Sequence, residues 1–149
     1  MELDNLYQEV ILDHYKRPQN KKLSEIYDAQ VHHVNPSCGD EIDLNLRIVD
    51  GVVKNITWDG VGCSISQASV SILTELLTEK PIATAYEIFD QFVALMQSKG
   101  TITGDESVLE DAIALAGVSK YPARIKCALL GWMAFKDASV QAQSKSELE

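Results

Sequence analysis

Cysteine is scarce in this sequence: there are three, an odd number that cannot be fully paired in disulfides within the chain. The chain begins with an acidic stretch and lacks the basic and apolar segments of a secretory signal peptide at that end. We therefore expect a cytoplasmic protein in a reducing compartment. In such a compartment, thiols are more often catalytic or metal-binding than cross-linked.

Basic residues and long apolar runs are also lacking. The 13 lysines and arginines face 22 aspartates and glutamates, which gives a formal net charge of −9. Because nucleic acids are polyanions, we expect no nucleic-acid partner, whereas the acidic surface suits a basic protein partner or simply solubility. The longest apolar run, residues 127–135, is far shorter than the roughly 20 residues needed to span a bilayer, so we expect no membrane segment.

The length and composition predict one domain. A chain of 149 residues with 46% hydrophobic residues can bury a sizeable core without disulfides. Neither an internal repeat nor a linker divides it, so we assign residues 1–149 to a single domain. The tail after about residue 140 is polar, and we expect it to be frayed.

The first half of the chain predicts one helix and three strands. Apolar side chains recur at helical spacing over residues 3–17, at Leu3, Leu6, Tyr7, Val10 and Ile11, and Pro18 ends the pattern. Residues 42–48 alternate between apolar and polar, which is typical of a half-buried strand. The Asp50-Gly51 pair predicts a tight turn into a further strand over residues 52–58, and a weaker strand covers residues 30–34.

The second half of the chain predicts helices. Ser64 and Gln67 fit a capping box at the start of one helix, and a second helix covers residues 83–97. Ser107 and Glu110 fit the cap of a short helix that ends at Gly117, and the last helix starts near Pro122. The predicted class is therefore α+β, with a small three-stranded antiparallel sheet packed against about five helices.

The cysteines carry the chemistry. Cys38 and Cys63 lie in glycine-flanked turns at strand ends, where demanding backbone geometry is more typical than simple packing. Asp40 lies two residues after Cys38, so both side chains can turn toward one point. The interpretation is a shared metal or sulfur-handling site formed by Cys38, Asp40, Cys63 and Cys127. Arg124 stands one helical turn before Cys127, where a guanidinium would favour the thiolate.

Each of these residues also has an ordinary structural interpretation. A single buried cysteine such as Cys127 is often an apolar filler, and Arg124 alone would more often be a solvated helix residue. The spacing of the cysteines matches no compact zinc-finger pattern. His14 falls on the apolar face of the first helix, where a packed, hydrogen-bonded histidine is the common outcome. His32 and His33 would point to opposite faces of a strand, so we place no histidine among the ligands.

Four motifs in matching order resemble one known family. The chain is similar to the U-type iron–sulfur assembly proteins (the IscU/NifU N-terminal family) from Leu6 to about Phe135. The motifs are YQEVILDHYKRPQN at residues 7–20, NPSCGD at 35–40, GVGCSIS at 60–66 and YPARIKC at 121–127. The resemblance implies a SufE/NifU-like fold.

Two departures from the scaffold members of that family resemble its SufU branch of zinc-dependent sulfurtransferases. Scaffold members place a histidine directly before the last cysteine, where this chain has Lys126. The segment between Cys63 and Cys127 is also longer, with the additional residues around 97–112. The resemblance implies zinc bound by Cys38, Asp40, Cys63 and Cys127, with Cys38 as the persulfide acceptor and Arg124 as a supporting residue.

The implied function is sulfur transfer in iron–sulfur cluster biogenesis. The implied partners are a PLP-dependent, SufS-like cysteine desulfurase, which supplies the sulfur, and a downstream iron–sulfur assembly scaffold. One alternative is that the chain is itself a scaffold, with an iron–sulfur cluster or iron at the same residues. The other is a structural zinc site in an interaction module.

Overall fold

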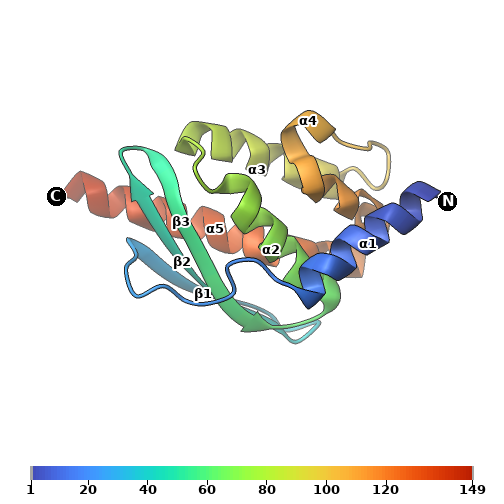
Figure 1. Cartoon of the computed structure of the whole chain (residues 1–149), viewed down its shortest axis with the longest axis horizontal. Helices are drawn as coiled ribbons and strands as arrows, with labels where there is room; N and C mark the ends of the chain where they lie inside the picture. The colour runs from blue at the N-terminus through green and yellow to red at the C-terminus, as the bar shows by residue number, and fades with distance from the viewer. Residues whose placement is uncertain (1, 149) are drawn as a thin grey trace.

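The computed structural model contains three strands and a set of helices in the predicted order (Figure 1). It describes the backbone of residues 2–148 and the side chains of residues 8–145, so the side chains of Leu3, Leu6 and Tyr7 lie outside the described part. The elements are α1 (Glu2–Lys16), β1 (Ala29–Asn35), β2 (Asp40–Val49), β3 (Val52–Val61), α2 (Ser64–Leu77), α3 (Ile82–Gln97), α4 (Glu106–Leu109), the 3-10 helix η1 (Glu110–Lys120) and α5 (Pro122–Leu148). The predicted α+β class is confirmed.

The sheet is an antiparallel meander in the order β1-β2-β3. Ile42, Leu44 and Leu46 of β2 are almost fully buried, as the alternating pattern predicts. Asp50 and Gly51 both have positive φ, at 53° and 75°, which is the geometry expected of the tight turn between β2 and β3.

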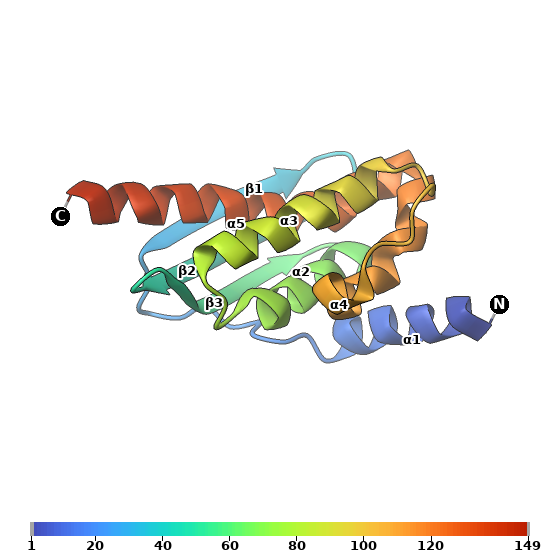
Figure 2. The ribbon, with the colours of Figure 1, turned by 90° about the horizontal axis from the view of Figure 1, so that it is seen from above.

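Helices cover one face of the sheet, and the long helix α5 packs along β1 and β2 (Figures 1 and 2). Trp58 of β3 and Trp132 of α5 are fully buried, and the ring of Trp132 stacks on Phe92 of α3 with centroids 4.1 Å apart. The buried apolar side chains form one core cluster. The single-domain assignment of residues 1–149 stays our proposal.

Two of the predicted helix caps are wrong. Cys63, not Ser64, is the N-cap of α2, and its side chain makes no capping hydrogen bond. Asp105, not Ser107, caps α4 by accepting from the N–H of Ser107, and α4 ends at Leu109 rather than Gly117. A 3-10 helix continues from there to Lys120.

α5 continues as a helix to Leu148, past the point where we expected the tail to fray. A helical conformation does not test whether the tail moves, so the expectation that it is frayed stays a prediction. Among residues 2–148, no helix has the length and apolar character needed to cross a bilayer.

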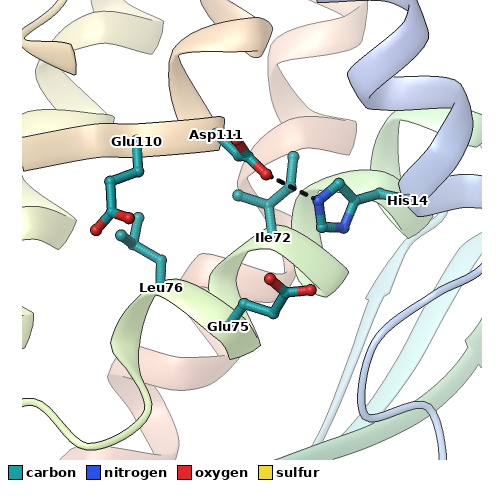
Figure 3. Close-up of a pocket in the computed structure, with 6 residues that line it drawn as sticks. All are labelled: His14, Ile72, Glu75, Leu76, Glu110 and Asp111. Atoms are coloured by element: carbon teal, nitrogen blue, oxygen red, sulfur yellow. Dashed lines mark hydrogen bonds and ion pairs between the residues drawn. The ribbon is translucent and has the colours of Figure 1, made fainter.

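His14 fastens α1 to two other elements (Figure 3). The ring is only 7% exposed, with Nδ1 2.8 Å from Oγ of Ser71 on α2 and Nε2 3.3 Å from Oδ2 of Asp111 on η1. Oγ of Ser71 also accepts a hydrogen bond from the N–H of Gln19, just beyond α1. The expectation of a packed, hydrogen-bonded histidine is confirmed.

Replacing His14 by alanine should destabilise the fold without touching the cysteines. The substitution removes two hydrogen bonds and leaves a gap under α1, so we expect the free energy of unfolding to fall by about 2–4 kcal/mol. Urea denaturation followed by circular dichroism measures the change. Glu9→Ala, an exposed position on the same helix, is the matched control. A loss of stability no larger than that of the control would show that His14 does not hold α1.

Candidate metal centre

Cys38 lies on the turn that joins β1 to β2. The turn is tight, because the N–H of Cys38 donates to the carbonyl of Asn35 and Gly39 has a φ of 72°. The side chain of Cys38 is exposed, and its Sγ lies 3.1 Å from Sγ of Cys127 on α5. The exposed turn therefore brings its thiol next to that of Cys127, which is 89 residues further along the chain.

Asp40, the first residue of β2, is a buried carboxylate with donors on both oxygens. The side chain is 1% exposed. Oδ1 accepts from the N–H of Cys63 at 2.9 Å and from the hydroxyl of Ser66 at 3.2 Å. The Nδ2 amide of Asn35 lies 3.5 Å from Oδ2. These donors satisfy an acidic group that would otherwise be costly to bury.

Cys63 links β3 to α2. Its backbone is extended, with φ −72° and ψ 168°, and its N–H is one of the free donors at the start of α2. This N–H donates a hydrogen bond to Asp40, so the carboxylate replaces the predicted capping box. A negative charge is favourable at the positive end of a helix. The thiol of Cys63 is half-buried and lies 3.8 Å from Oγ of Ser66.

Cys127, in the second turn of α5, is fully buried but faces the other site residues. Its Sγ lies 3.1 Å from Sγ of Cys38 and 3.9 Å from Nδ2 of Asn35. Burial first, and then hydrogen bonding with the side chains of Cys38, Asp40 and Cys63, raises the pKa of the Cys127 thiol well above its ordinary value.

A buried thiol with a raised pKa keeps its proton at neutral pH. The expectation that Arg124 would favour the thiolate of Cys127 stays a prediction. Arg124 lies in the first turn of α5 with its side chain exposed, so water screens its charge. A cation at this site would have to displace the thiol proton as it binds.

The donor atoms fit a small tetrahedral cation. One atom each from Cys38, Asp40 and Cys127 lie within 4.8 Å of one another. Zn–S bonds of about 2.3 Å place the donors of a tetrahedral zinc site roughly 3.5–3.8 Å apart, so small side-chain movements would be sufficient. Thiols with a single carboxylate are a donor set that suits zinc or iron. Cys63 borders this group, and its place as the fourth ligand stays a prediction.

The remaining histidines face away from the donor group. His32 lies on the open face of the sheet, 2.8 Å from Asp43 and 3.2 Å from Glu41 on β2. His33 points the other way, toward Asp137 of α5 at 2.9 Å. The expectation that the two rings point to opposite faces is confirmed.

Sequence reasoning missed two residues beside the site. Asn35 and Ser66 are both buried and both contact Asp40, but neither is a metal ligand by type. Each lies within a motif that contains a cysteine, at residues 35–40 and 60–66. Their position in these motifs was the signal that could have identified them. Their contacts with Asp40 could not be predicted, because these contacts depend on how β2 packs against α2.

Comparison with known proteins places the chain among iron–sulfur assembly proteins. A family profile described as the NifU-like N terminal domain matches residues 6–128. The zinc-dependent sulfurtransferase SufU of Bacillus subtilis is 45% identical over 136 residues, which are 90% of this chain and 89% of that protein. The iron-sulfur cluster assembly scaffold protein IscU of Streptococcus pyogenes is 35% identical over 147 residues, which are 98% of this chain and 90% of that protein.

A solved structure shows the same fold. The N-terminal part of a NifU-like protein from Brucella abortus superimposes with a TM-score of 0.85 at 22% identity. The superposition covers 97% of this chain and 99% of that one. At this identity the likeness supports the fold alone.

Gly62 gives a test of the donor arrangement. A Cβ at Gly62 would lie 2.5 Å from both Oδ1 of Asp40 and Oγ of Ser66, so Gly62→Ala should displace the carboxylate. We expect the variant to bind at least about tenfold less tightly to zinc, as is typical when the support of a ligand is lost. Elemental analysis after dialysis against a weak chelator measures retained metal.

Gly117→Ala is the control for this substitution, because nothing lies within 4 Å of a Cβ at Gly117. Equal zinc retention in both alanine variants would contradict the prediction that the position of the Asp40 carboxylate controls metal binding.

Proposed function

The chain belongs to the family of NifU-like N-terminal domains, and on that premise we propose that it is a zinc-dependent sulfurtransferase of iron–sulfur cluster biogenesis. It would accept sulfur on Cys38 from a cysteine desulfurase and pass it on. The similarity to a zinc-dependent sulfurtransferase over most of both chains supports this proposal. The observation that carries it is the pairing of an exposed thiol, Cys38, with a buried one, Cys127, 3.1 Å away.

The two thiols suit different tasks. Cys38 is exposed on a turn, so a partner can reach it without opening the core. Cys127 is buried on a long helix, so it can hold a cation but cannot meet a partner. Cys38 is therefore the acceptor, and Asp40, Cys63 and Cys127 are the residues that would remain on the metal. When bound, zinc holds thiols as thiolates without redox chemistry.

The transfer is a thiol–persulfide exchange with balanced atoms and electrons. The Cys38 thiolate attacks the outer sulfur of the partner's persulfide, which forms a new S–S bond on Cys38. The original S–S bond breaks, and its electron pair leaves with the partner's thiolate. The outer sulfur keeps its proton, so no external oxidant or reductant is required. Arg124 is exposed one turn from Cys127, where its charge can support the anionic groups at the exposed side of the site.

We propose a PLP-dependent, SufS-like cysteine desulfurase as the donor and a downstream iron–sulfur assembly scaffold as the acceptor. The net charge of −9 supports protein partners with basic surfaces rather than nucleic acid.

The scaffold function is the weaker alternative. It is supported by the similarity to an iron–sulfur scaffold over nearly the whole chain, and the same donor atoms would hold iron. Lys126 precedes Cys127 at the position where scaffold members have a histidine. A lysine cannot replace that histidine as a metal ligand, which disfavours the scaffold function. Anaerobic reconstitution with iron and sulfide separates the two. A stable cluster at stoichiometric yield that passes to an apo-protein would favour the scaffold.

Removing the Cys38 thiol should abolish sulfur acceptance and leave the fold intact. We expect Cys38→Ser to gain no sulfur atom when it is incubated with a desulfurase and cysteine, because a hydroxyl is a poor nucleophile toward persulfide sulfur. Intact-protein mass spectrometry detects the added sulfur, and desulfurase turnover is measured in parallel. Ser37→Ala, the exposed neighbour on the same turn, is the control.

Unchanged sulfur acceptance and unchanged stimulation of the desulfurase by Cys38→Ser would remove Cys38 from this role. In an interaction module with a structural zinc site, neither the wild type nor the variant would acquire sulfur.

A further inference from the structure

Ser66 lies in the first turn of α2, next to the Asp40 carboxylate. It is not one of the proposed metal ligands. It is 5% exposed, and its hydroxyl has two acceptors within reach. These are Oδ1 of Asp40 at 3.2 Å and the carbonyl of Cys63 at 3.0 Å. The thiol of Cys63 lies 3.8 Å from the same Oγ. One hydroxyl thus contacts two of the four proposed ligand residues.

The two oxygens of Asp40 face different surroundings. Oδ1 faces α2, where it accepts from the N–H of Cys63 and the hydroxyl of Ser66. Oδ2 lies on the side of the thiols, because the same Nδ2 of Asn35 that is 3.5 Å from Oδ2 is also 3.9 Å from Sγ of Cys127. Oδ1 therefore has two close donors, at 2.9 and 3.2 Å, whereas the Asn35 amide is 3.5 Å from Oδ2, which leaves Oδ2 as the oxygen more open to a cation.

The space around Oδ1 is closely fitted. Gly62 precedes Cys63, and a side chain at Gly62 would overlap both Oδ1 and Oγ of Ser66. The glycine thus lets the carboxylate reach the first turn of α2. The contact between Asp40 and Ser66 therefore depends on the lack of a side chain at Gly62.

We propose that Ser66 is a positioning residue of the metal centre. Its hydroxyl, together with the N–H of Cys63, fixes Oδ1 so that Asp40 offers the single oxygen Oδ2 to the metal. The proposal rests on the metal-bound site of the proposed function. It also explains how the site keeps its shape when Cys38 leaves to accept sulfur, because Asp40 stays fastened to α2 by two hydrogen bonds that do not involve the metal.

Ser66 also has an ordinary role, since a serine in a first helical turn often donates to a carbonyl three residues earlier. That role concerns the helix alone and predicts no effect on the metal. Zinc affinity measured on the isolated chain therefore separates the two roles, and it does not depend on sulfur transfer.

The experiment compares three variants of the zinc-loaded full chain with the wild type. Ser66→Ala removes the hydroxyl, Ser66→Thr keeps it, and Ser64→Ala makes the same chemical change at an exposed position of the same helical turn. Zinc dissociation constants come from competition with a chromophoric chelator. The absorption spectrum of each cobalt-substituted protein reports ligand geometry, and the melting temperature after metal removal reports the fold.

We expect Ser66→Ala to weaken zinc binding by about 10–100-fold, which is the usual effect of losing a hydrogen bond that orients a ligand. Its cobalt spectrum should change, while its melting temperature without metal should fall by only about 2–4 °C, because the N–H of Cys63 still donates to Oδ1. Ser66→Thr should restore most of the affinity, and Ser64→Ala should match the wild type.

Equal zinc affinity in Ser66→Ala and Ser64→Ala would overturn the proposal. It would also be overturned if the affinity loss of Ser66→Ala came with an equal loss of fold stability and an unchanged cobalt spectrum, because Ser66 would then be a packing residue. A wild-type chain that binds no zinc would overturn the proposed function together with this inference, whereas a failed sulfur-acceptance assay would leave the inference standing.

Discussion

The hydrogen bond from the N–H of Cys63 to Oδ1 of Asp40 connects the sheet to the helical layer at the metal centre. It joins the first residue of β2 to the N-terminus of α2, where free N–H groups and the helix dipole favour a negative charge. The carboxylate thereby satisfies one of the free N–H groups at the start of α2. This contact fastens the turn that carries Cys38 to the junction that carries Cys63, next to the pairing of Glu41 with Val61 in the sheet.

The core determines where the third thiol lies. α5 packs along the sheet, with Trp132 buried and stacked on Phe92 of α3, so the helix cannot rotate without breaking the core. That packing faces Cys127 toward Asn35 and Cys38 rather than into the aliphatic interior. The rigid helix supplies the buried ligand, and the exposed turn supplies the reactive one. A site that must hold a cation and also release one thiol to a partner benefits from this division.

The local sequence pattern predicted the elements well and their caps poorly. Alternation over residues 42–48 and the Asp50-Gly51 pair were sufficient to predict β2 and its turn, because strand burial and positive φ are local properties. The cap of α2 was mispredicted because the group that satisfies its N–H comes from Asp40, 23 residues earlier in the chain. The cap of α4 was mispredicted by two residues. Both Asp105 and Ser107 are good capping residues, and in the structure Asp105 is the cap.

By itself, the sequence determined the α+β class and predicted one candidate site of Cys38, Asp40, Cys63 and Cys127, because residue types and motif order can be read along the chain. Only the tertiary structure decided which atoms meet. It set the 3.1 Å approach of two sulfurs 89 residues apart, the raised pKa of Cys127 and the place of Ser66 behind Asp40. Those properties depend on burial and on the relative placement of distant elements, and no local pattern encodes either.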